Sequence, residues 1–133
     1  MQYNRIGITT IRKTHRLTCH CEGVELELDL PEGVVEPRRC NCSFCKRRGA
    51  IAGSISEDNL RIVKGSEHLR LYQFGTHVSE HYFCGICGIY THHRRRSDPR
   101  FFGYNVGCLE DVNPYDLNEV PISDGMNHVC DRI

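Results

Sequence analysis

The chain has 133 residues, a length that suits one domain with a hydrophobic core of useful size. Its 17 lysines and arginines balance 17 aspartates and glutamates, so no net field favours nucleic acid or a membrane surface as a partner. No apolar run approaches the roughly 18 residues of a membrane span, and residues 1–16 lack the apolar stretch of a signal peptide. We therefore expect a cytoplasmic protein without a membrane segment.

The N-terminal quarter of the chain predicts a hairpin followed by a connection. Residues 1–15 are polar and suit a partly mobile lead-in or an edge strand. Residues 16–21 are predicted to form a strand that turns at Glu22 and Gly23. Apolar and acidic residues then alternate over residues 24–30, which is the period of a half-buried strand. Residues 31–37 begin and end with proline and are interpreted as a connection.

A series of short strands separated by turn signals follows. The predicted strands are residues 50–55, 60–64, 69–74, 78–83 and 89–93. Residues 43–49 suit one helical turn, and residues 105–109 are interpreted as a strand end. The tail after Pro114 is expected to pack over the domain without forming a core element. This spacing indicates a mainly β fold, a single domain over residues 1–133 with a core of about 15–110 and a polar tail at 111–133.

The nine cysteines are the strongest signal of function. In a reducing cytosol they favour metal ligation or catalysis over a disulfide framework, and seven of them fall into three tight clusters. Cys19 and Cys21 would point to one face of a strand end. Cys84 and Cys87 form a CxxC motif followed by glycine, which is typical of a zinc knuckle. Together these four thiolates predict a closed structural zinc site; the alternative is a set of core cysteines.

The remaining cluster is a CxCxxC motif formed by Cys40, Cys42 and Cys45. Three protein ligands leave the fourth position of a zinc ion open, which is typical of a catalytic site. A thiol substrate in that position would be held as a thiolate, the reactive form. The alternative is a second closed site, completed by Cys108 or by a histidine.

Basic residues surround this motif and are candidates for binding a substrate's carboxylates: Arg38, Arg39, Lys46, Arg47 and Arg48. They could equally form a solvated face. A second basic run over residues 92–96 either lines the same cleft or forms an exposed turn. Cys108 is interpreted as buried and inert, and Cys130 has no partner at motif spacing. The scattered histidines are interpreted as surface or packing residues: His15, His68, His77, His81 and His128.

The order of the cysteine motifs resembles that of the glutathione-dependent formaldehyde-activating family, which also includes centromere protein V. The resemblance extends from about His15 to Leu109. It rests on CHC at 19–21, CNCSFC at 40–45, FCGICG at 83–88, THHRRRSDP at 91–99 and NVGCLE at 105–110. The resemblance implies an Mss4-like fold of zinc-bound β-sheets. It also implies a structural zinc on Cys19, Cys21, Cys84 and Cys87, and a catalytic zinc on Cys40, Cys42 and Cys45.

The activity implied by the resemblance is condensation of glutathione with formaldehyde to S-(hydroxymethyl)glutathione, classed as a carbon–sulfur lyase in the reverse direction. The expected cofactors are two zinc ions, and the expected partners are these two small molecules, with no membrane and no nucleic acid. One rival is a non-catalytic zinc-binding interaction module, and another is a related enzyme acting on a different thiol or aldehyde. A third is a sulfoxide reductase with Cys108 or Cys130 as its reactive thiol.

Overall fold

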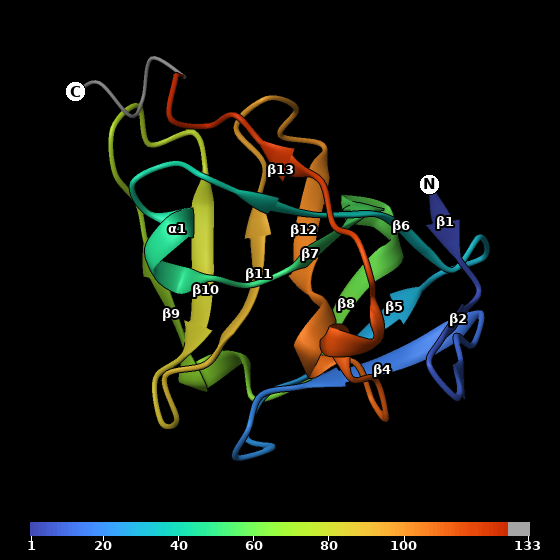
Figure 1. The fold of residues 1–133 in the computed structure, drawn as a ribbon. Helices are drawn as coiled ribbons and strands as arrows, with labels where there is room; N and C mark the ends of the chain where they lie inside the picture. Colours follow the sequence, from blue (N-terminus) through green and yellow to red (C-terminus); the bar gives the residue numbers. More distant parts are fainter. Residues whose placement is uncertain (128–133) are drawn as a thin grey trace.

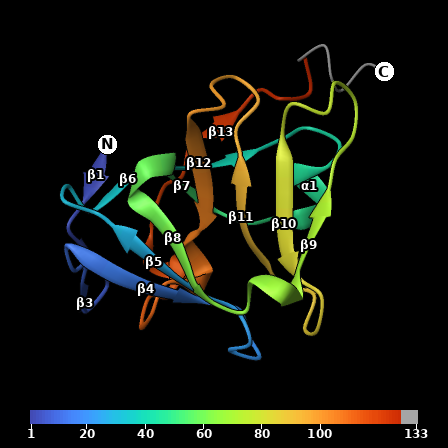
Figure 2. The same cartoon turned by 180° about the vertical axis from the view of Figure 1, so that it is seen from behind.

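A computed structural model of the protein describes residues 1–127, which form a mainly β fold (Figure 1). The large sheet has eight strands in the order β1-β6-β7-β12-β11-β10-β9, with β13 paired to β6. A second sheet has the order β4-β5-β8, and β2 pairs with β3. Views from front and back place β4 and β5 across the molecule from β9 and β10 (Figures 1 and 2). The strands are β1 (Gln2–Tyr3), β2 (Arg5–Ile6), β3 (Thr9–Thr10), β4 (Thr14–Thr18), β5 (Glu25–Asp29), β6 (Val34–Cys40), β7 (Ala52–Ser56), β8 (Leu60–Lys64), β9 (Leu69–Tyr72), β10 (Glu80–Cys84), β11 (Tyr90–Arg94), β12 (Phe101–Asn105) and β13 (Ile122–Ser123).

Helical structure is limited to short turns. Within residues 1–127 the one α-helical turn is α1 (Cys45–Arg48). It ends at Gly49, whose φ of 70° lies in the left-handed region that glycine adopts readily. The 3-10 turns are Glu57–Asn59, Ser66–His68, Val106–Cys108 and Pro114–Asp116. Residues 1–127 contain no helix long and apolar enough to cross a bilayer. The expected mainly β fold with short helical turns is confirmed.

The alternation predicted over residues 24–30 forms the inner face of the smaller sheet. β4 and β5 pair antiparallel with Leu17 opposite Leu26, and neither leucine is exposed at all. Burying each of these side chains contributes roughly 2 kcal/mol to folding. On the opposite face, Arg61 of β8 forms ion pairs with Glu27 and Asp29. The sheet therefore has one apolar face in the core and one charged face in solvent.

The connection predicted over residues 31–37 is confined to residues 31–33, and residues 34–37 form the first half of β6. Pro37 cannot donate a backbone hydrogen bond and would interrupt a regular ladder. The pairing of β6 with β7 shifts register between Val35 and Arg38, and Glu36 adopts a φ of 47° in the left-handed region. This irregularity accommodates the proline. The strand therefore continues to Cys40 and delivers the CxCxxC motif to the end of β6.

The tail differs from expectation as well. Val112 and Leu117 are buried and belong to the core cluster, so the tail contributes to the core in addition to covering it. β13 pairs with β6 in parallel, with Ser123 opposite Cys40. A two-residue strand has too short a hydrophobic pattern to predict from sequence. His128 and Cys130 lie outside the described residues.

Candidate metal centres and cleft

Four cysteine sulfurs lie close together at two hairpin turns, the turn after β4 and the turn between β10 and β11. Both turns lie at the bottom of Figure 1. Cys19 and Cys21 lie in the turn after β4, Cys84 is the last residue of β10, and Cys87 lies in the turn between β10 and β11. All four sulfurs lie within 4.8 Å of one another. The Glu22 amide donates to the Cys19 carbonyl at 3.1 Å, so a turn brings the first two sulfurs together, where we expected an extended strand.

The four sulfurs fit a zinc ion. Sulfurs bound tetrahedrally about 2.3 Å from zinc lie roughly 3.8 Å apart. The Cys21 sulfur is 3.6 Å from that of Cys19 and 3.7 Å from that of Cys84. Backbone amides donate to three of the sulfurs: Val24 to Cys19 at 3.3 Å, Gly23 to Cys21 at 3.4 Å and Ile86 to Cys84 at 3.4 Å. Such donors stabilise thiolates, and four ligands would leave no position for a substrate.

A second group contains the sulfurs of Cys40, Cys42 and Cys45. Cys40 ends β6 and Cys45 begins α1, and backbone amides again donate to sulfur, from Cys42 to Cys40 at 3.5 Å and from Cys45 to Cys42 at 3.2 Å. Within the group, a hydrogen bond from the Cys45 thiol lowers the pKa of Cys40 to about 5. Among the described residues no further Cys, His, Asp or Glu belongs to this group. The donor set suits a zinc ion with one open position.

Cys108 does not complete this second group. Its sulfur contacts the Tyr90 carbonyl at 3.6 Å. Burial raises the pKa of Cys108 to about 12, with a smaller contribution from nearby Cys19 and Cys87 of the first group. The residue therefore lies beside the four-cysteine group, as a half-buried packing thiol.

The three-cysteine group lies in the wall of a cleft of about 310 Å³. Small residues widen the cleft, among them Gly53 and Gly103. A Cβ at Gly103 would lie 2.3 Å from the His93 ring, so only glycine fits there. The charged groups around the cleft are mainly cationic, since two carboxylates, Glu36 and Asp124, face five guanidiniums: Arg38, Arg39, Arg48, Arg95 and Arg96.

Only some of the basic residues predicted to contact a substrate line the cleft. Arg38, Arg39 and Arg48 line the cleft. Lys46 and Arg47 are exposed on α1 and do not belong to its lining, although the sequence suggested a substrate contact for both. The cause is the helical turn itself, because successive residues of a helix point in different directions. Of α1, the first residue, Cys45, and the residue next to the C-cap, Arg48, line the cleft.

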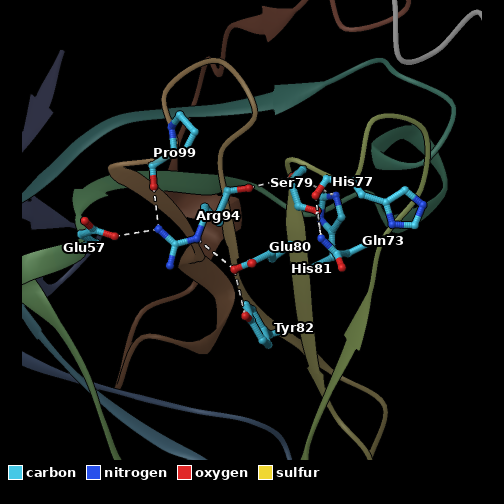
Figure 3. A network of polar contacts seen from close by, with 9 residues as sticks. All are labelled: Glu57, Gln73, His77, Ser79, Glu80, His81, Tyr82, Arg94 and Pro99. Atoms are coloured by element: carbon cyan, nitrogen blue, oxygen red, sulfur yellow. Dashed lines mark hydrogen bonds and ion pairs between the residues drawn. The ribbon is translucent and has the colours of Figure 1, made fainter.

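Of the second basic run, residues 92–96, again only some residues line the cleft. Arg95 and Arg96 line the cleft, whereas Arg94 turns away and pairs with Glu57 at 2.6 Å and Glu80 at 2.9 Å (Figure 3). Arg95 donates to the Ser54 hydroxyl at 3.0 Å. Burial, and then the neighbouring Arg38, lowers the pKa of Arg95. Among residues 1–127, no carboxylate forms an ion pair with Arg48, Arg95 or Arg96.

Two histidines form part of the cleft wall: sequence reasoning missed His81 and left the position of His93 open. His81 was interpreted as a surface or packing residue, but it lies opposite His93 across β10 and β11, with the two rings 5.3 Å apart, and both line the cleft. Burial, and then Arg48 and Arg96, lowers the pKa of His81 to about 3. His15 does act as a packing residue, since both ring nitrogens are bonded to backbone groups.

The C-terminal segment closes one side of the cleft. The Asn41 amide donates to the Ser123 carbonyl at 3.1 Å, and the Met126 amide donates to the Asn41 side chain at 2.9 Å. Gly125 is buried, and a Cβ there would lie 2.4 Å from the Cys40 sulfur. Arg96 donates to the Gly125 carbonyl at 3.3 Å. The segment over residues 122–126 is therefore packed directly on the three-cysteine group.

The protein is therefore a small, mainly β protein with two cysteine groups that could each hold a metal ion, and one of them lies in a cationic cleft. The profile of the glutathione-dependent formaldehyde-activating enzyme family, GFA, matches residues 14–121. The chain belongs to this family, and the resemblance inferred from the cysteine motifs is confirmed.

Two relatives agree with this assignment. The crystal structure of a Rhodobacter sphaeroides protein is 56% identical, covers 81% of this chain and 99% of that chain, and superposes with a TM-score of 0.79. A Phaeosphaeria nodorum protein with the provisional name glutathione-dependent formaldehyde-activating enzyme is 26% identical over 102 residues, which are 74% of this chain and 53% of the relative. The chain thus spans about half the length of that curated relative.

Proposed function

We propose that this protein is a zinc-dependent carbon–sulfur lyase that condenses glutathione with formaldehyde to S-(hydroxymethyl)glutathione. The observation that carries the proposal is the three-cysteine group in the wall of a cationic cleft. Cys40, Cys42 and Cys45 would hold the catalytic zinc, and Cys19, Cys21, Cys84 and Cys87 the structural one. Bound zinc would lower the pKa of a thiol at the open position and keep it as a thiolate.

The chain's own residues bind and orient the thiol substrate. Glutathione carries two carboxylates, which suit the guanidiniums of Arg38, Arg95 and Arg96. The glutathione sulfur forms a bond to the formaldehyde carbon and the carbonyl π-bond opens. The proton that leaves the thiol ends on the new hydroxymethyl oxygen. Because this addition also occurs in water, positioning the two reactants and supplying the thiolate are sufficient catalysis.

The reaction is tested by magnetisation-exchange NMR on an equilibrium mixture of glutathione, formaldehyde and their adduct. We expect wild-type protein that holds both zinc ions to exchange the hydroxymethyl protons faster than buffer. The control is the Cys42→Ser variant, which lacks one ligand of the open group but retains the closed one. Equal rates for wild type, variant and buffer would contradict the proposed reaction. A zinc-binding interaction module would then be the better description.

A further inference from the structure

The two cysteine groups differ in the donors that contact their sulfurs. In the closed group the donors to Cys19, Cys21 and Cys84 are backbone amides. In the open group a side-chain cation also contributes, since Nη2 of Arg48 lies 3.6 Å from the Cys45 sulfur. This difference makes chemical sense. A zinc ion with three thiolates carries a net charge of about −1, and an incoming thiolate substrate adds another negative charge. Only the open group has to accept that further charge.

A chain of hydrogen bonds determines where the Arg48 guanidinium points. Arginine can only donate, so Nη1 of Arg48 donates to Nδ1 of His81 at 3.1 Å, and Nδ1 must be unprotonated. The proton of His81 is therefore on Nε2, which lies 3.2 Å from the Ser79 hydroxyl. That hydroxyl donates to the Arg94 carbonyl at 2.7 Å, and both Ser79 and His81 appear in Figure 3. The chain ends on the backbone of β11, so it is anchored to the large sheet.

Aromatic rings hold the same two side chains from the sides. The Arg48 guanidinium lies over the Tyr90 ring at 3.7 Å and over the Phe44 ring at 4.8 Å. The His81 ring lies 4.4 Å from the ring of Phe44 and 5.8 Å from that of Phe74. A free arginine side chain would lose rotamer entropy on adopting one orientation. Here the packing fixes that orientation before any ligand arrives.

We propose that Arg48 and His81 are positioning residues of the open cysteine site. His81 orients Arg48, and the Arg48 guanidinium offsets the charge of the Cys45 sulfur so that the site can accept a further thiolate. His81 performs this role as a neutral ring, because its Nδ1 lone pair accepts from Arg48. The inference rests on the zinc site of the proposed function but not on the formaldehyde reaction.

The test compares zinc affinities of the two sites by stepwise chelator competition on the full chain. The Cys42→Ser variant identifies which zinc belongs to the open group. We expect Arg48→Met to lower open-site zinc affinity by about 10- to 100-fold and to leave the closed site unchanged. His81→Leu removes the acceptor for Arg48 and should lower open-site affinity by about tenfold. His81→Asn should restore most of that loss, because Oδ1 of asparagine occupies the place of Nδ1.

A second measurement reports the incoming thiolate directly. With cobalt in the open site, the absorption bands respond to an added thiolate ligand, and we expect Arg48→Met to require about tenfold more glutathione for the same change. The matched control is Arg94→Met. Arg94 is another half-buried arginine stacked on a ring, that of Phe102 at 4.6 Å, but it pairs with Glu57 and Glu80 away from both cysteine groups.

The outcomes separate this inference from the proposed function. Wild-type protein that takes no zinc at the open group would overturn both. Zinc at the open group with the same affinity in wild type and Arg48→Met would overturn the inference alone. An equal loss in Arg48→Met and Arg94→Met would also overturn it, because the effect would then be a general loss of stability. If Arg48→Met does not fold, the comparison of His81→Leu with His81→Asn decides, and equal affinities in that pair reject the role of His81.

Discussion

A half-buried guanidinium without an ion pair costs free energy, because desolvation disfavours its charge and distant carboxylates offset only part of the loss. Arg95 is such a group. It donates to a neutral hydroxyl, that of Ser54, and burial and the nearby Arg38 lower its pKa more than the carboxylates of Glu36 and Asp98 raise it. This arrangement becomes favourable once an anion binds between the guanidiniums. The cleft therefore has an excess of positive charge, which a thiol that carries carboxylates can neutralise.

We predict that Arg95→Gln raises the KM for glutathione by about tenfold, because one charge-assisted hydrogen bond is lost, and lowers kcat much less. Steady-state kinetics over a range of glutathione concentrations measure the two effects separately. Arg12→Gln serves as a control, because Arg12 is two-thirds exposed and pairs with Glu110 outside the cleft. Similar KM values for Arg95→Gln and wild type would show that Arg95 does not bind the substrate.

Candidate site residues could be predicted where they belong to a motif that spans only a few positions of the sequence. Each of the three cysteine motifs could be recognised from its local spacing, because a metal-binding turn is defined within a few positions, and the structure brings the CxC and CxxC motifs together in space. The two histidines and the arginines of the cleft were missed or left ambiguous, because their position depends on which strands pair. His81 reaches the cleft only because β10 lies next to β11, and Arg95 only because the hairpin of β11 and β12 brings it to Ser54 of β7. A single sequence does not specify those pairings.

At the scale of elements, β6 and β13 determine how open the three-cysteine group is. The irregularity around Pro37 allows β6 to run on to Cys40, and β13 then pairs along the same strand end. Neither element was predicted, because a proline argues against a strand and a two-residue strand has almost no pattern. The segment after β13 packs on Cys40 at Gly125, so this edge of the site depends on a glycine far along the chain.

Replacing Gly125 with alanine should disturb the open site specifically. The added Cβ would overlap the Cys40 sulfur, so either the C-terminal segment or Cys40 must move. We expect Gly125→Ala to lower open-site zinc affinity by about tenfold, as measured by chelator competition, while zinc at the closed site is retained. The control is Gly107→Ala, because Gly107 lies in an exposed turn where the nearest atom to an added Cβ is 3.3 Å away. If both variants bind zinc as wild type does, the segment does not constrain Cys40.

At the scale of the whole molecule, the two cysteine groups connect very different lengths of chain. The closed group joins Cys21 to Cys84, 63 positions later, and so ties the β4–β5 hairpin to the β10–β11 hairpin. The open group is complete within six residues, Cys40 to Cys45. Metal binding to the closed group is therefore coupled to global folding, whereas metal binding to the open group orders only a local turn.

We predict that replacing a cysteine with serine lowers stability much more at the closed group than at the open group. Cys84→Ser should unfold the protein or lower its Tm by roughly 15–20 °C, because structural zinc contributes on the order of 10 kcal/mol and about half of that accounts for such a shift. Cys42→Ser should leave the Tm within a few degrees of wild type and remove one zinc. Calorimetry and metal analysis of both variants measure this. Equal losses of stability would show that the three-cysteine group is structural as well.

The spacing of the closed group also determines the order in which the two cysteine groups are completed during synthesis. At about 5–20 residues per second, the 63 positions between Cys21 and Cys84 correspond to roughly 3–13 s on the ribosome. For the last 39 of these positions, after Cys45, the emerging chain already carries the complete CxCxxC motif, while the first two cysteines of the closed group still lack their partners. The site that we assign to catalysis is thus the first that a nascent chain can fill. The site that stabilises the fold can be filled only after Cys87 has left the ribosome.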